Sequence, residues 1–103
     1  MRRGTTDTQT FTTPYEASTI AVLYVTYEQR GATILEKALG DSGLTVSDYE
    51  ITVNLTQAET LLFSSNPTAP VSVQIRGVLT TGAAVGSNIC EFYVCPILKD
   101  GEI

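Results

Sequence analysis

The 103-residue sequence has no histidine and no tryptophan, and only two cysteines and one methionine. Histidine is the commonest general base at neutral pH and the commonest side-chain ligand of metals, so its absence argues against both kinds of site. Lys and Arg total 6 against 11 acidic residues, which gives a formal net charge of -5. Nucleic-acid binding needs clustered positive charge, and the one adjacent basic pair is Arg2-Arg3. The sequence therefore disfavours a nucleic-acid partner.

Long apolar runs are also absent. The longest, residues 20–25, is far below the roughly 20 residues that a membrane-spanning helix needs. Arg2-Arg3 is like the charged start of a signal peptide, but the threonine-rich residues 4–13 supply no apolar stretch after it. We therefore expect neither a secretory signal nor a membrane contact. The remaining composition, 43% hydrophobic and 17% charged, is that of one globular domain over residues 1–103.

Short runs of alternating apolar and polar residues, each closed by turn residues, predict an antiparallel β protein. In the clearest run Tyr49, Ile51, Val53 and Leu55 share one face. The expected strands are residues 9–13, 20–28, 32–39, 44–46, 49–55, 71–79 and 87–94. About seven short strands predict an all-β, antiparallel two-sheet sandwich. We expect it to be Ig-like only loosely, because a core tryptophan and widely separated cysteines are missing.

Two segments need separate decisions. Residues 32–39 fit a helical stripe that Gly40 would stop, but a three-residue hairpin loop at residues 29–31 favours a strand, which we choose. Thr56 and Glu59 have the spacing of a helix capping box, which predicts one short helical turn near residues 56–62. Residues 64–70 and 80–86 are expected to be loops, and Ile97 and Leu98 to continue the last strand beyond Pro96.

The two cysteines do not predict a catalytic or a disulfide site. On one strand, Cys90 and Cys95 would lie roughly 16 Å apart with side chains on opposite faces, whereas a disulfide needs Cα atoms within about 7 Å. A catalytic thiol needs a base, and the neighbouring Glu91 would raise a thiol pKa. We expect reduced, partly buried thiols.

The other candidate groups are also explained best as structure. Asp48 and Glu50, at i and i+2 on a strand, are more typical of a solvated face than of a glycosidase pair. A calcium site from Asp41 and Asp48 lacks the usual ligand loop. The two glycines in residues 82–87 are followed by no lysine, so a hairpin is expected there and not a phosphate loop. The sequon at Asn54 is attributed to chance.

Five tyrosines are the best material for a binding surface, because tyrosine rings can stack on sugars. Tyr27 and Tyr49 are expected to point inward, and the lack of tryptophan weakens the case. The full set is Tyr15, Tyr24, Tyr27, Tyr49 and Tyr93.

Two terminal segments are distinctive, residues 1–6 (MRRGTT) with Phe11-Thr12, and residues 97–103 (ILKDGEI). These segments resemble small structural proteins encoded in prophages of Gram-positive gut bacteria. Similar residues also occur at 55–57, 59–60, 63 and 87–89. The chain departs from that family at Cys90, Phe92-Tyr93 and Cys95. The resemblance implies a structural role in the virion or its tail and supplies no catalytic residue.

The expected function is that of a non-enzymatic structural or assembly module of a phage or prophage particle, in its tail or baseplate region. The alternative is a small β-sandwich module that binds carbohydrate or a host surface ligand. We expect no catalytic, cofactor-binding or metal-binding residue and no cofactor. The expected partners are other phage structural proteins and further copies of the chain, with no nucleic acid or membrane. The expected location is the cytoplasm of the bacterial host during assembly, and then the virion.

Overall fold

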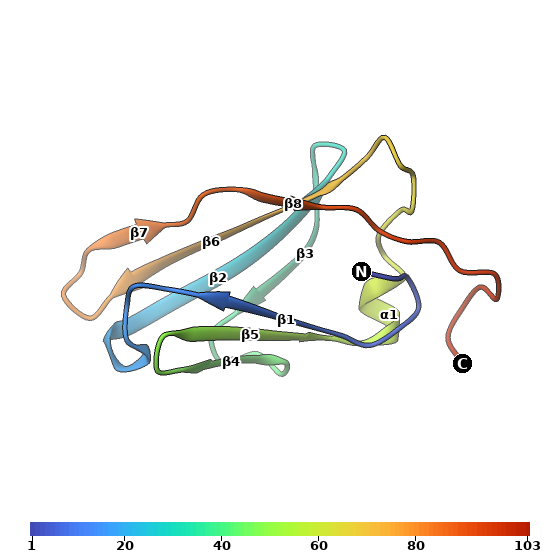
Figure 1. Ribbon diagram of the computed structural model, residues 1–103. Helices are drawn as coiled ribbons and strands as arrows, with labels where there is room; N and C mark the ends of the chain where they lie inside the picture. The colour runs from blue at the N-terminus through green and yellow to red at the C-terminus, as the bar shows by residue number, and fades with distance from the viewer.

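The alternating segments form eight strands, and together they make two antiparallel sheets that face each other (Figure 1). The computed structural model describes residues 1–103, with 49% in strands and 7% in helices, and confirms the predicted all-β sandwich. The strands are β1 Asp7–Thr12, β2 Ile20–Gln29, β3 Ala32–Ala38, β4 Leu44–Ser47, β5 Glu50–Leu55, β6 Val71–Leu79, β7 Ala84–Gly86 and β8 Cys90–Phe92. A 3-10 turn, η1 Ala17–Thr19, and a short helix, α1 Gln57–Thr60, complete the elements.

The order of the strands fixes which edges lie together. The smaller sheet has the order β1-β5-β4, and the larger has β3-β2-β6-β7, with β8 also paired to β6. The short connection 39–43 passes from β3 to β4 and so joins the two sheets along one long side. The edges formed by β1 and by β7 and β8 therefore lie along the other long side, where β8 runs above β1 in Figure 1.

The core fills the space between the sheets with the residues that the alternation placed inward. Tyr27 of β2 is fully buried and packs edge-on against two phenylalanines, with ring centroids 5.9 Å from Phe63 and 6.4 Å from Phe92. The buried apolar residues are Leu23, Val25, Tyr27, Leu44, Ile51, Val53, Leu55, Phe63, Val71, Val73 and Val94. This confirms the inward face expected for β2 and for most of β5.

The β2–β3 hairpin confirms the strand at residues 32–39 and corrects its turn. Gln29 pairs directly with Ala32, so the loop has two residues instead of the expected three. Arg30 and Gly31 have φ values of 55° and 74°, the left-handed pair that two-residue hairpins favour. Hydrogen bonds to β2 satisfy the backbone amides and carbonyls of β3. These residues therefore form a strand, although the spacing of their apolar side chains also fits a helix.

Three expectations near the strand ends are wrong. Tyr49 is 51% exposed instead of inward, because it lies in the tight turn between β4 and β5. The predicted loop 80–86 contains β7, and the predicted long strand 87–94 is reduced to the three residues of β8. Between them, the Ser87 hydroxyl accepts the Ile75 amide at 3.0 Å, so a side chain replaces part of the strand ladder.

The chain does not continue as a strand beyond Pro96. Leu98 is fully exposed, and Cys95 instead forms a parallel bridge with Arg2, with the Cys95 amide donating to Met1 at 2.7 Å. The Arg3 guanidinium donates to the carbonyls of Phe63 at 2.6 Å and Leu61 at 3.1 Å. A cation at the end of a helix is favourable, so Arg3 ties the N-terminal segment to α1.

The capping box is confirmed at the start of α1. The Glu59 amide donates to the Thr56 hydroxyl at 3.2 Å, and the Thr56 amide donates to the Glu59 carboxylate at 3.0 Å. Phe63 follows the helix into the core, while Leu62 stays exposed, so this turn closes one end of the sandwich. None of the helices is long and apolar enough to cross a membrane.

Replacing Thr56 with alanine is expected to lower the free energy of unfolding by about 0.5–2 kcal/mol, because the helix start loses its side-chain acceptor. Urea denaturation of the wild type and the variant measures the difference. Thr45→Ala, at an exposed position of β4, is the control and should change stability by less than about 0.5 kcal/mol. Equal midpoints for wild type and Thr56→Ala would contradict the assignment of the cap.

Candidate functional site

The outer edge of β1 is a free hydrogen-bonding surface. The Thr13 amide donates to the Tyr49 carbonyl at 2.9 Å, and the β1–β5 register is uninterrupted. The backbone amides and carbonyls of the odd-numbered residues of β1 are therefore the ones that point toward β5. The amides and carbonyls of Thr8, Thr10 and Thr12 therefore point away from β5, and no strand pairs with them. Their side chains are exposed on the outer face of the sheet. This edge can accept a further extended strand.

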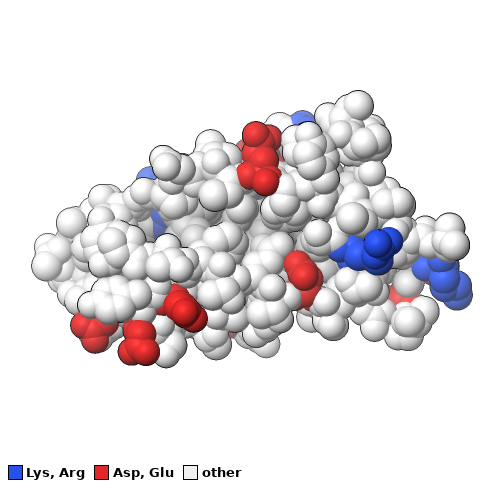
Figure 2. Space-filling model, in the orientation of Figure 1, with Lys and Arg blue, Asp and Glu red and all other residues white.

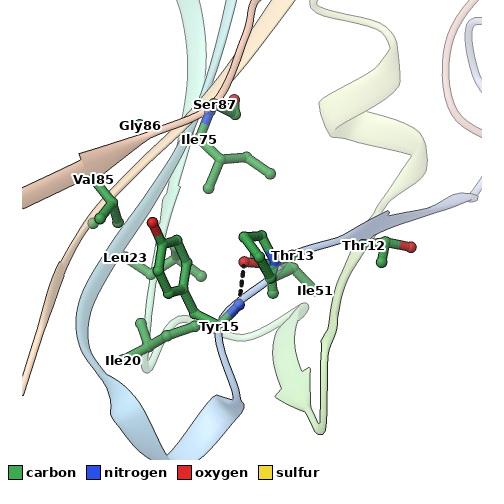
Figure 3. Close-up of a pocket in the computed structure, with 12 residues that line it drawn as sticks. Thr12, Thr13, Tyr15, Ile20, Leu23, Ile51, Ile75, Val85, Gly86 and Ser87 are labelled. Atoms are coloured by element: carbon green, nitrogen blue, oxygen red, sulfur yellow. Dashed lines mark hydrogen bonds between the residues drawn. The ribbon is translucent and has the colours of Figure 1, made fainter.

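A cavity of about 160 Å³ opens beside the end of β1, between the two sheets (Figure 3). Leu23, Ile51 and Ile75 line its inner part. Tyr15 stands near Val85 at its mouth in Figure 3, with the Tyr15 amide donating to the Thr13 hydroxyl at 3.3 Å. Cavities of this size and polarity accommodate one small apolar group. The cavity can therefore take an apolar side chain.

A second, shallower depression of about 290 Å³ lies on the outer face of the larger sheet. Tyr24, 43% exposed, lies in it with Val22, and Thr26, Glu36 and Arg76 surround them with polar groups. An aromatic ring bordered by an acid and a guanidinium can stack on a sugar ring and bind its hydroxyls.

A nearly buried ion pair, Lys37 with Glu59, joins β3 to α1. Burial raises the pKa of the Glu59 carboxyl, but hydrogen bonds from Lys37 and the Thr56 amide, together with the positive charge of Lys37, outweigh it. The net effect holds the pKa of Glu59 below its usual range. The two side chains are only 11% and 18% exposed, and their pairing connects β3 to the start of α1.

Acidification is expected to weaken the fold through Glu59. Its folded pKa is below the unfolded value of about 4.3, so its contribution to stability is present above that pH and is lost as the pH falls through the folded pKa. Glu59→Gln should therefore flatten the fall of unfolding free energy on acidification, as measured by urea denaturation at several pH values. Glu28→Gln, which removes a carboxylate at an exposed position, is the control. Equal acid slopes in all three proteins would contradict the assignment.

Tyr27 is held neutral by its surroundings. Burial raises the pKa of its phenol well above the usual range, and the charges of Asp7 and Glu59 add to the effect. The neutral hydroxyl donates to the Gln9 side chain of β1 at 2.8 Å. Tyr27 therefore links the two sheets and is unavailable as a base or a sugar-stacking ring.

The residues considered for chemistry do not converge in space. Asp48 lies in the β4–β5 turn with φ 50°, so it does not share a strand face with Glu50, and that expected placement is wrong. Cys90 and Cys95 are free, as expected, but both are exposed instead of partly buried. Asn54 is exposed on β5, where its side chain accepts a hydrogen bond from Thr8 at 2.8 Å.

The remaining candidates also lie apart from one another. Residues 82–87 lie in the β6–β7 hairpin, but residues 84–86 form strand β7 instead of the expected connection. The tyrosines occupy separate places: Tyr27 in the core, Tyr15 at the cavity, Tyr24 on the outer face of the larger sheet, and Tyr49 and Tyr93 exposed elsewhere. They do not form one stacking platform. The unpaired edge of β1 could be anticipated from the uncharged residues 9–13, but the cavity could not, since its walls come from separate segments.

Charge is distributed unevenly over the side that carries β1 and β8 (Figure 2). Acidic side chains lie at the lower left of this face and at two places nearer its middle, and the most prominent basic side chains lie at the right. Acidic groups spread over this face disfavour contact with a phosphate backbone.

No protein-family model, no curated protein and no solved structure matches the chain. The resemblance to prophage structural proteins and the loose likeness to immunoglobulin sandwiches therefore rest on the residues quoted for them, and both stay predictions.

Proposed function

We propose that the chain is a non-enzymatic structural module that assembles with other proteins of a phage or prophage particle, in the tail or baseplate region. The observation that carries this proposal is the unpaired, nearly uncharged edge of β1, since such an edge is a template for strand addition by a protein partner. The assignment to a phage particle rests on the resemblance of residues 1–6 and 97–103.

The segment 97–103 supports a role in contacts with proteins. Its Leu98 and Ile103 side chains are almost wholly exposed, while Ile97 is partly buried and lies beside Gly4 and Leu61. Two hydrogen bonds between the Gln57 side chain and the Ile103 backbone also hold the end of the segment. A segment that is held in place and exposes apolar side chains is suited to bind a neighbouring protein. On this proposal the chain is made in the cytoplasm of the bacterial host and becomes part of the virion.

Quantitative mass spectrometry of purified particles tests the proposal. Particles banded on a density gradient and washed at high salt should retain the chain in a fixed ratio to the other structural proteins. A matched sample of host lysate without particles, banded in the same way, is the control. Particles that lack the chain after the wash would contradict a structural role.

A second candidate function, carbohydrate binding, is favoured by the depression around Tyr24. Its ring is exposed beside Glu36 and Arg76, a combination suited to stack on and hydrogen-bond a sugar. A glycan array with the wild type and Tyr24→Ala separates this candidate from assembly: sugar binding lost in Tyr24→Ala would support it. The control Tyr49→Ala removes an exposed tyrosine outside the depression and should not alter binding.

A further inference from the structure

Three of the four sheet edges carry features that discourage the addition of a strand. The β3 edge includes the charged Glu36 and Lys37 and lies beside an irregularity in the β2–β3 ladder. The β4 edge has only four residues. The edge formed by β7 and β8 is broken into two strands of three residues each, separated by residues 87–89. Charge, shortness and interruption are the ways in which proteins prevent unwanted pairing at an edge.

The fourth edge, β1, is neither short nor interrupted. Its six residues contain no proline, lysine or arginine, and the single charge, Asp7, lies at its start. The register with β5 runs without a shift over the whole strand, so β1 is regular. A protein that protects its other edges and leaves this one regular and nearly uncharged is expected to have a partner for it.

We propose that β1 pairs antiparallel with β1 of a second copy of the chain, around a two-fold axis at Thr10. Thr10 then faces Thr10 of the second copy, and Thr8 faces Thr12. These are the residues whose amides and carbonyls point outward, so each facing pair exchanges both backbone hydrogen bonds. The two three-stranded sheets become one continuous sheet with β1 at its centre.

The side chains fit this register. The facing pairs are threonines, and cross-strand threonine pairs are favourable in antiparallel sheets. Asp7 faces Thr13 of the second copy, so the pairing sets no like charges opposite each other. The self-complementary contact also closes on itself, which gives a dimer and not an open chain of molecules.

An interface made of two paired six-residue strands buries less surface than a stable protein complex, which buries about 1,200–2,000 Å². We therefore expect a dimer that dissociates on dilution. This dimer would be the first contact within the proposed particle assembly, but its existence rests on the edge geometry.

The first test removes one outward amide. Sedimentation equilibrium of the wild type up to about 1 mM should show the mass rising from 11.1 kDa toward twice that value. Thr10→Pro removes an amide that the β1–β5 ladder does not use, so the fold should survive while the dimer weakens by at least about tenfold. Thr10→Ala keeps the amide and should still dimerise. A monomer at every concentration in the wild type, or an equal dimer in Thr10→Pro, would overturn the proposal.

The second test uses charge at the axis and does not depend on proline. Thr10→Lys and Thr10→Glu should each be monomeric, because in a dimer of either variant two like charges would face each other at residue 10. An equimolar mixture of the two variants should form a heterodimer, because opposite charges then face each other. The pair Thr45→Lys and Thr45→Glu, on exposed positions of β4, is the matched control and should dimerise as the wild type does. A mixture of the residue-10 variants that stays monomeric would contradict the two-fold register. Mass spectrometry of purified particles tests separately whether the chain belongs to a particle. A failure of the dimer proposal can therefore be distinguished from a failure of the proposed function.

Discussion

Truncating Ile51 to alanine is expected to lower the free energy of unfolding by about 2–5 kcal/mol, because it removes buried apolar groups and enlarges the cavity that this side chain lines. Ile51 is almost wholly buried, at the centre of the smaller sheet, where β5 pairs with both β1 and β4. Leu23→Ala, on the facing sheet, should cost a similar amount. Urea denaturation monitored by circular dichroism measures both differences.

The adjacent residue is the matched control. Thr52 lies next to Ile51 in the sequence but on the outer face of the same strand, so Thr52→Ala should stay within about 1 kcal/mol of the wild type. A Thr52 variant that loses more stability than the Ile51 variant would mean that β5 presents its other face to the core.

Replacing Gln29 with leucine is expected to cost about 2–5 kcal/mol, although leucine is close in size and more apolar. The Gln29 amide group is 96% buried and donates at 2.8 Å to the carbonyls of both Ser64 and Ala69, while its oxygen accepts the Ser64 amide at 2.8 Å. Leucine would leave these backbone groups without partners, at about 1–3 kcal/mol each before the loop relaxes.

A second glutamine provides the control for Gln29. Gln74 makes one exposed hydrogen bond, to the Ser87 carbonyl at 3.1 Å, so Gln74→Leu should change stability by less than about 1 kcal/mol. Chemical denaturation of both variants compares them directly. Equal midpoints for Gln29→Leu and the wild type would mean that residues 64–70 do not depend on this buried amide.

The sequence predicted those parts of the fold that depend on local pattern. Alternation located β2, β5 and β6, because each has one face in the core and one in solvent. The spacing of Thr56 and Glu59 located the cap, because its two hydrogen bonds lie within four residues. Residues 9–13 carry no charge, which is a local feature of an edge left open to a partner.

Other features depend on contacts between distant segments, which local patterns do not encode. Gln29 resembled an exposed turn residue, and only the loop 64–70 folded over it makes it part of the core. The last strand failed as a prediction because the Ser87 side chain interrupts the ladder, although the residues around it alternate well. The cavity is lined by residues from both sheets and from the connection after β1, so no single stretch of sequence indicates it.

Amide hydrogen exchange along β1, followed as the protein is concentrated, tests most directly whether this edge is a docking site for a second copy. The odd-numbered amides, which bond to β5, should be protected at every concentration and serve as the internal control. If β1 pairs with β1 of a second copy, the amides of Thr8, Thr10 and Thr12 exchange freely in dilute solution and become protected in concentrated solution. Free exchange of these three amides up to about 1 mM, a concentration at which even weak dimers are populated, would contradict it.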